Sequence, residues 1–210
     1  MPNWCYNTAK FTHKNPAMIA RVAKGFNEGK LFGEFAPTPP ELLEDVPVGE
    51  NYVERAATRE AENEENFGHK DWYHWNIDNW GTKWDINTEE ADDIELADGA
   101  LEISLSFDTA WSPPIEFYRT MTDGFDFEVE AYYNEEGMTF CGKYTSEDDD
   151  DFYEYSDQTG DWVRENIPND IHEHWGIADL LDDMAEEEED DDDIGMDDAE
   201  DGDENESYGE

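Results

Sequence analysis

Residues 101–133, LEISLSFDTAWSPPIEFYRTMTDGFDFEVEAYY, hold two alternating segments separated by a helical one. Apolar residues occupy every second position from Leu101 to Phe107, which predicts a strand with one buried face and one solvated face. Ser112 is placed to cap the next segment, with Pro113 at its first helical position. FDFEVEAYY then alternates again. The stretch therefore predicts a strand–helix–strand unit.

Further elements flank this unit. WCYNTAKFT, residues 4–12, reads as a strand, and Asn15 followed by Pro16 predicts the start of a helix. The helix would bury one face, formed by Ile19, Val22, Ala23 and Phe26. Asp98-Gly99 marks a tight turn, so the residues before it would add a hairpin strand. NEEG turns the chain into a last strand, MTFCGKYT.

This order of elements predicts an α+β fold, a ferredoxin-like split β-α-β sandwich. An antiparallel sheet would carry two helices on one face, with the added hairpin strand at its side. Residues 30–82 are interpreted as an insertion. Within it, 53–68 would form an exposed helix or a mobile loop, and DWYHWNIDNW a helix that Gly81 ends. TKWDINTEE would then open a strand.

Acidic residues dominate the composition. The chain has 59 Asp and Glu against 12 Lys and Arg, a formal charge of −47. Residues 182–210 hold 18 of the acidic residues and none of the basic ones, which predicts a disordered acidic tail that contributes no fold stability. Residues 1–181 keep 41 acidic and 12 basic residues, a net charge of −29. Such a charge disfavours direct binding to nucleic acid or to an anionic membrane.

Three segments follow from these boundaries. Residues 1–145 would form the ferredoxin-like domain, 146–181 an acidic extension packed on it, and 182–210 the tail. The N-terminus lacks the features of a signal peptide, and no apolar run reaches the length of a membrane span. These observations predict a cytoplasmic protein; they predict no oligomeric state.

Motifs for chemistry are absent from the sequence. Cys5 and Cys141 are predicted to be free thiols in strands, and no CxxC, HExxH or calcium-loop pattern accompanies the histidines or carboxylates. We therefore expect no metal and no cofactor. No catalytic residue can be named, and enzyme activity has no positive support in the sequence.

Two sets of residues are candidates for binding. Trp4, Trp80, Trp84 and Trp111 are either core residues around a helix-to-strand turn or a pocket or partner contact in which rings from separate segments converge. Asp126, Glu128 and Glu130 would share one strand face. A two-residue step along a strand spans about 6.7 Å, similar to the spacing of phosphates along a nucleic-acid strand.

Four blocks of sequence resemble the YubB ferredoxin-like domain family of bacteriophages and conjugative plasmids. The blocks are MPNWCYN at the start, WYHWNIDNWGTKWD at 72–85, FDTAWSPP at 107–114 and GMTFCGKY at 137–144. The resemblance covers residues 1 to about 145. It implies the ferredoxin-like fold and a mobile-element origin, and it carries no catalytic residues. No iron–sulfur cluster is expected, because two cysteines cannot supply four thiolates.

The leading hypothesis is a non-enzymatic phage or plasmid accessory protein in the host cytoplasm. It would present an acidic surface to a basic host protein and act as a decoy or modulator; mimicry of a nucleic acid is one form that this role could take. One alternative is a small-ligand-binding protein or an enzyme with an aromatic pocket near the four tryptophans. Another is single-strand nucleic-acid binding by the sheet, by analogy with other ferredoxin-like folds.

Overall fold

The structure of the chain is a computed structural model that describes residues 3–87 and 93–194, the last seven by their backbone alone. The chain divides into two compact units, Met1–Ser156 and Asp157–Glu210. Each unit is described by itself. Within the described residues, none of the helices is both long enough and apolar enough to cross a membrane.

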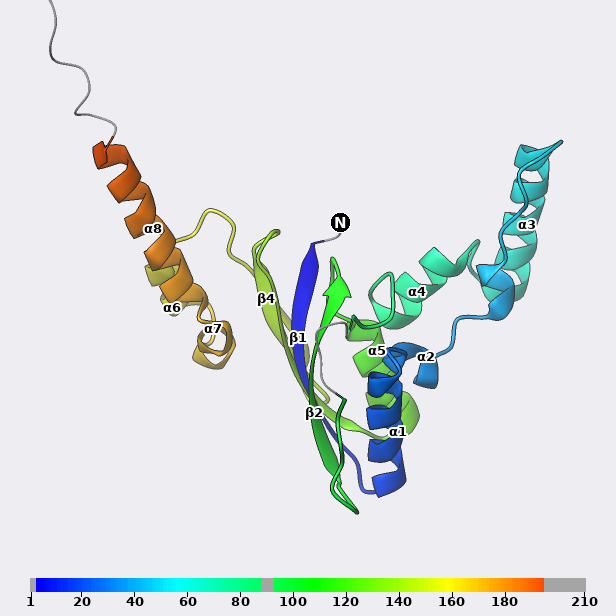
Figure 1. The fold of residues 1–210 in the computed structure, drawn as a ribbon, viewed down its shortest axis with the longest axis horizontal. Coiled ribbons are helices and arrows are strands. Elements are labelled where there is room, and N and C mark those ends of the chain that lie inside the picture. The colour runs from blue at the N-terminus through cyan, green and yellow to red at the C-terminus, as the bar shows by residue number, and fades with distance from the viewer. Residues whose placement is uncertain (1–2, 88–92, 195–210) are drawn as a thin grey trace, which may run out of the picture. The chain divides into compact units, whose positions relative to one another are not determined.

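The first unit is built on a five-stranded antiparallel sheet (Figure 1). Its strands are β1 (Trp4–Thr12), β2 (Glu102–Ala110), β3 (Glu128–Glu135), β4 (Phe140–Thr145) and β5 (Asp149–Glu154), in the order β2-β1-β3-β4-β5. β1 lies between β2 and β3 and is antiparallel to both. The path from β2 to β3 is therefore a split β-α-β unit, which confirms the predicted ferredoxin-like α+β fold.

Three helices cover one face of this sheet: α1 (Pro16–Asn27), α2 (Leu31–Phe35) and α5 (Ile115–Arg119) (Figure 1). Asn15 caps α1 as predicted, because its side chain accepts a hydrogen bond from the Ala17 N–H at 3.1 Å. The core between the helices and the sheet includes Phe11, Ile19, Val22, Phe26, Phe32, Leu105, Phe107, Phe117, Tyr118 and Val129. The opposite face of the sheet carries Lys10, Glu128 and Glu130, together with the aromatic residues Tyr6 and Tyr132.

The insertion is mostly helical. It contains the short 3₁₀ helix η1 (Pro40–Leu43), α3 (Tyr52–Phe67) and α4 (Trp72–Trp80). α3 is an exposed helix, as one of the two predictions for that segment had it, and it ends at Gly68. Asp71 caps α4 by accepting from the His74 N–H at 3.0 Å, and Gly81, with a φ of 85°, ends it as predicted.

Two predicted strands near residue 90 are wrong. Residues 82–87 bend instead of forming a strand and contribute one isolated bridge, Asn87 to Asp108. The turn at Gly99 is present, but the described residues before it, 93–97, form no strand; residues 88–92 lie outside the described residues. β2 pairs with β1 along its whole length, so a hairpin partner is not needed. Leu101 consequently lies before β2 and is 48% exposed.

The helix after β2 begins later than predicted. Ser112 does not cap it: α5 begins at Ile115, after Pro114, and continues as the π-helical segment η2 (Thr120–Gly124). The Ser112 hydroxyl instead donates to the Gly81 carbonyl at 2.7 Å. Pro114 occupies the N-cap position of α5, and its side chain makes no capping hydrogen bond.

The sheet extends beyond residue 145 through β5, a strand the sequence did not reveal because Asp149, Asp150 and Asp151 have low strand propensity. Pairing with β4 stabilises it. In addition, the Arg119 guanidinium contacts the Asp149 carboxylate at 2.9 and 3.0 Å, and the Tyr133 hydroxyl donates to Asp150 at 2.7 Å. Tertiary contacts therefore override local propensity here.

The second unit consists of α6 (Gly160–Asn166), α7 (Asn169–Trp175) and α8 (Ile177–Ile194). Its buried apolar side chains are Val163, Ile167, Ile171, Ile177 and Ala178. The predicted disordered tail began at residue 182, but residues 182–194 continue α8. Arg164 binds Asp179 and Asp182 at 2.7 and 2.8 Å, which ties the start of that helix to α6. The rest of the predicted tail, 195–210, lies outside the described residues.

Candidate functional site

The structure separates the four predicted tryptophans. Trp80 belongs to the core: it lies on Phe32 with ring centroids 5.7 Å apart, and its indole N–H donates to the Ala36 carbonyl at 2.8 Å. Trp4 is half-buried at the start of β1. Trp84 and Trp111 are 40% and 41% exposed. The core interpretation therefore fits Trp80, and the surface interpretation fits Trp84 and Trp111.

Trp84 and Trp111 stack on each other, with ring centroids 6.1 Å apart and an interplanar angle of 29°. The Lys83 ammonium lies 4.3 Å from the centroid of Trp84 and 5.3 Å from that of Trp111. It also lies 5.9 Å from the ring centroid of Tyr73, on α4. We call these four residues, Tyr73, Lys83, Trp84 and Trp111, the Trp84–Trp111 cage.

Hydrogen bonds to backbone carbonyls hold the loop that carries Trp111 in place. Its φ is 65°, a left-handed conformation that is uncommon for a large side chain. Its N–H donates to the Asn3 carbonyl at 3.0 Å. On either side, the Thr109 hydroxyl donates to the Ser112 carbonyl at 2.7 Å, and the Thr82 hydroxyl donates to the Ala110 carbonyl at 3.0 Å. The ring is thus presented by a tightly held loop.

Asp85 fixes the other side of the cage, next to Trp84 in the chain. Its carboxylate accepts hydrogen bonds from the backbone N–H groups of Phe32, Gly33 and Ile86, at 2.9, 2.8 and 2.9 Å. The bonds from Phe32 and Gly33 cap the start of α2. Burial nevertheless raises the pKa of Asp85 above its ordinary value, although the three N–H donors act in the opposite direction.

The cage can hold a cation. The faces of Trp and Tyr rings carry partial negative charge, and an ammonium or guanidinium within about 6 Å of a ring centroid is attracted to them. Two cage members, Tyr73 and Lys83, were not predicted from the sequence. For Lys83, the available signal was its position next to Trp84 in the sequence, because the chain bends there and the Lys83 side chain can then reach the Trp84 ring.

The predicted acidic set does not share a strand face. Asp126 lies before β3 with a φ of 57°, and this left-handed residue breaks the alternation; its carboxylate lies 3.8 Å from the Lys14 ammonium. Glu128 and Glu130 do lie on β3 with exposed side chains. The Lys143 ammonium pairs with Glu130 at 3.2 Å.

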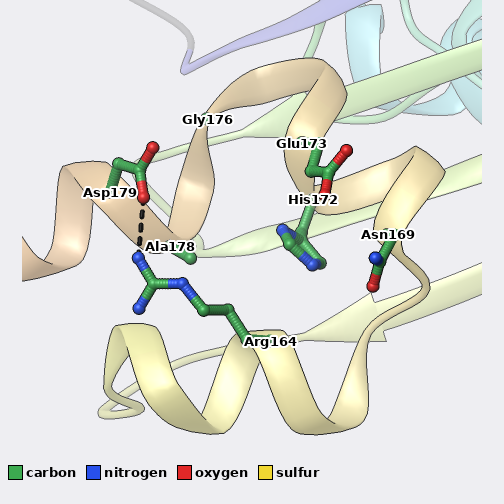
Figure 2. Close-up of a pocket in the computed structure, with 7 residues that line it drawn as sticks. All are labelled: Arg164, Asn169, His172, Glu173, Gly176, Ala178 and Asp179. Atoms are coloured by element: carbon green, nitrogen blue, oxygen red, sulfur yellow. Dashed lines mark hydrogen bonds and ion pairs between the residues drawn. The ribbon is translucent and has the colours of Figure 1, made fainter.

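A cavity of about 460 Å³ lies within the second unit, between α6 and the start of α8 (Figure 2). Figure 2 shows the His172 ring extending from α7 toward α6. His172 is buried, and its Nε2 has no hydrogen-bond partner among the described residues. The Arg164 guanidinium at the cavity is held by Asp179 and Asp182. Its charge is therefore already balanced by the unit's own carboxylates.

The two thiols are poor nucleophiles. Cys5 and Cys141 are free and buried in β1 and β4, as predicted. Burial raises the pKa of Cys141 to about 12 and that of Cys5 further, so both are protonated at neutral pH. Across the residues that the structure describes, no three His, Cys, Asp or Glu side chains are grouped to hold a metal ion.

A comparison with protein families agrees with the fold. The family model for the ferredoxin-like domain in Api92-like protein matches residues 83–208, more than half of the chain. No curated protein matches this chain. A solved structure of protein api92 from Yersinia pseudotuberculosis is 13% identical over 74% of this chain and 99% of that one, with a TM-score of 0.36. The family match extends past residue 145, where the resemblance seen in the sequence ended. On this match the chain belongs to the family of ferredoxin-like domains in Api92-like proteins.

Proposed function

We propose that this protein is a non-enzymatic accessory protein that binds a basic protein partner through its acidic surface. The observation that carries the proposal is the excess of carboxylates: 59 against 12 basic residues. A surface of this charge attracts a basic partner over a long range and orients it before contact. The partner would be held away from its usual anionic ligand, so the protein would act as a decoy or modulator.

The Lys and Arg side chains of the protein are too few to neutralise its carboxylates. Within the described residues, eight Lys and Arg side chains form ion pairs with carboxylates. The pairs are Lys10–Glu102, Lys14–Asp126, Arg21–Glu34, Lys24–Glu34, Arg59–Glu44, Arg119–Asp149, Lys143–Glu130 and Arg164–Asp179. Few positive charges thus remain to repel a basic partner, and many carboxylates remain to bind it.

One ordered acidic surface is the edge strand β5 and the turn before it. Six carboxylates fall in eight residues, Glu147 to Glu154, and β5 pairs with a neighbour on one side only. The bonds from Arg119 and Tyr133 described above hold this segment to the domain. Acidic groups fixed on an edge strand lose little conformational freedom when a partner binds.

Nucleic-acid binding by the open face of the sheet is disfavoured by the same charges. Tyr6 is exposed on this face and Tyr132 partly so, which would permit base stacking. However, the two lysines of the face, Lys10 and Lys143, are paired with Glu102 and Glu130. Phosphates would have to displace these carboxylates and approach a strongly acidic protein.

The aromatic-pocket alternative is weaker as well. Trp84 and Trp111 are both about 40% exposed, so they offer an open contact surface. Small-molecule sites usually enclose most of the ligand.

The proposed phage or plasmid origin and the host cytoplasm follow from the resemblance to the YubB ferredoxin-like domain family. They define where a partner would be sought.

The test is retention of basic proteins from a bacterial host lysate on the full chain. Captured proteins are compared at about 0.05 M and about 0.5 M NaCl, since the Debye length falls across this range. We expect proteins with net positive charge at low salt and their loss at high salt. A variant with Asp148, Asp151 and Glu154 changed to amides should retain less. Capture that ignores ionic strength, or that yields no basic protein, contradicts the proposal.

A further inference from the structure

We propose that the Trp84–Trp111 cage binds a cationic side chain of the basic partner, and that Lys83 is the internal occupant which this side chain displaces. The inference rests on the proposed function, because it names the group of the partner that the site would recognise. It adds a specific contact to an attraction that is otherwise spread over the acidic surface.

The position of Lys83 shows what the cage accepts. One ammonium lies within 6 Å of three ring centroids, those of Tyr73, Trp84 and Trp111. Cages of this kind recognise ammonium groups through the charge on the ring faces, and Trp gives the strongest attraction. Because Lys83 is only partly buried and reaches the rings from a bend, its side chain can leave without disturbing the core.

The Trp111 ring is held in place by a backbone conformation that is itself strained. Trp111 keeps a left-handed backbone, and strain of this kind persists where surrounding contacts impose it, often at binding sites. A core role does not require it, because both Trp84 and Trp111 remain about 40% exposed. Exposed, rigid aromatic side chains are frequent among the residues that dominate binding energies at protein interfaces.

Charge decides the kind of occupant. The protein carries a net charge of −47, which attracts cations and repels anions over its surroundings. A base could stack on Trp84 or Trp111, but its phosphates would be repelled. A Lys or Arg side chain satisfies both the ring faces and the surrounding field. The occupant is therefore a basic side chain of a protein, not a nucleotide.

If Lys83 occupies the cage, removing this lysine should strengthen the binding of a basic peptide. Removing Lys83 vacates the cage, so affinity for a basic peptide should rise, whereas the loss of Trp84 should reduce it. Deleting any lysine also makes the protein more negative. The matched control is therefore Lys14→Ala, which removes the same charge from a side chain that is 81% exposed and contacts Asp126.

The experiment measures binding of an alternating glycine–arginine peptide by calorimetry. Its control peptide has citrulline in place of arginine, which keeps the shape and removes the charge. The proteins are the full chain, Lys83→Ala, Lys14→Ala and the double variant Lys83→Ala/Trp84→Ala. Each is measured at about 0.05 M and about 0.5 M NaCl to separate long-range attraction from ring contact. Circular dichroism spectra confirm that all four fold alike.

We expect Lys83→Ala to bind the arginine peptide about two- to fivefold more tightly than the unchanged chain, at both salt concentrations. Lys14→Ala should differ by less than about twofold, and the double variant Lys83→Ala/Trp84→Ala should lose the gain seen for Lys83→Ala. If Lys83→Ala behaves as Lys14→Ala while binding stays salt-sensitive, the cage proposal is overturned and the proposed function stands. If the peptide binds no variant, the cage proposal is also overturned; the proposed function falls only if basic host proteins are not retained either.

Discussion

Trp80 and Trp84 lie on the same short stretch of sequence and have opposite environments. Trp80 ends α4 and is buried, and Trp84 follows the Gly81 bend and faces solvent. Trp80→Ala should destabilise the protein by about 3–5 kcal/mol, the usual cost of removing a large core ring. Trp84→Ala should cost less than about 1 kcal/mol, the value of an exposed cation–π contact. Urea denaturation of both variants measures the difference; equal losses would contradict the assignment of Trp84 to the surface.

Asp85 gives a prediction for pH. Burial raises its pKa in the folded protein above the usual 3.8. The folded state therefore binds more protons than the unfolded chain in the window from 3.8 up to the raised pKa. The stability contributed by protonation of Asp85 is complete below this window and is lost as pH rises through it.

The comparison is with Asp85→Asn, which does not titrate. The free energy of unfolding of the unchanged protein, minus that of Asp85→Asn, should fall as pH rises from 3.8 through the raised pKa of Asp85. Chemical denaturation at several pH values measures it. A difference that grows with pH would mean that the three N–H donors outweigh burial.

Single residues also show how far sequence reasoning reaches. The helix cap at Asn15 and the stop at Gly81 are local features, and both were predicted correctly. The separate environments of Trp80 and Trp84 were not predicted, because burial depends on which segment folds back over each ring. Lys83 joined the candidate site only through its distance to rings on two other segments.

At the scale of the elements, the end of α4 packs closely against the start of α5 at Gly81. Its φ is 85°, and a Cβ there would lie 2.9 Å from the Ile115 backbone nitrogen and 3.0 Å from the Pro113 carbonyl oxygen. Gly68 ends α3 with a similar φ of 75°, but a Cβ there meets nothing within 4 Å. The two glycines share the backbone strain and differ in packing.

Gly68→Ala should therefore cost about 1 kcal/mol, from the left-handed backbone alone. Gly81→Ala should cost about 1–3 kcal/mol more, because the backbone of α5 must move to admit the methyl group. Urea denaturation midpoints of the two variants measure this. Equal midpoints would show that the contact between Gly81 and α5 is loose, and the cage next to it would then be less rigid than proposed.

Element prediction succeeded where the pattern was local and failed where pairing was not. β1, α1 and the buried positions of β2 follow from periodicity. The predicted strand after Gly81 is wrong because the backbone bends there and pairs with β2 at one bridge only, Asn87 to Asp108. The Asp85 side chain bonds to N–H groups of α2 within this bend. β5 was missed since β4 and Arg119 stabilise an aspartate-rich strand that has little propensity of its own.

At the scale of the whole molecule, charge opposes folding. Like charges at a net −47 repel one another in the compact state, and added salt screens this repulsion. The Debye length falls from about 30 Å at about 0.01 M salt to about 3 Å at about 1 M. The thermal midpoint should therefore rise by several degrees as NaCl is added over this range. A midpoint that falls with NaCl would show that the ion pairs, which salt weakens, outweigh the repulsion.

The C-terminus tests where the folded part of the second unit ends. Removal of residues 195–210 deletes 8 carboxylates and no basic residue, so the charge changes from −47 to −39. Less repulsion should leave the thermal midpoint unchanged or slightly higher. Removal of residues 182–210 relieves more repulsion but also deletes Asp182, which pairs with Arg164 at 2.8 Å.

Asp182 also packs closely against Gly160 at the start of α6: a Cβ on that glycine would lie 2.2 Å from an Asp182 carboxylate oxygen. The cut after Leu181 leaves only the first few residues of α8, too short to be helical without its contacts. We therefore expect faster amide hydrogen exchange in α6 and α7 after this cut, and unchanged exchange after the cut at Ile194. Asp182→Asn in the full chain is the control for the ion pair alone and should give an intermediate rate. If amide exchange is unchanged after both cuts, the folded part of the second unit ends at residue 181, as the sequence predicted.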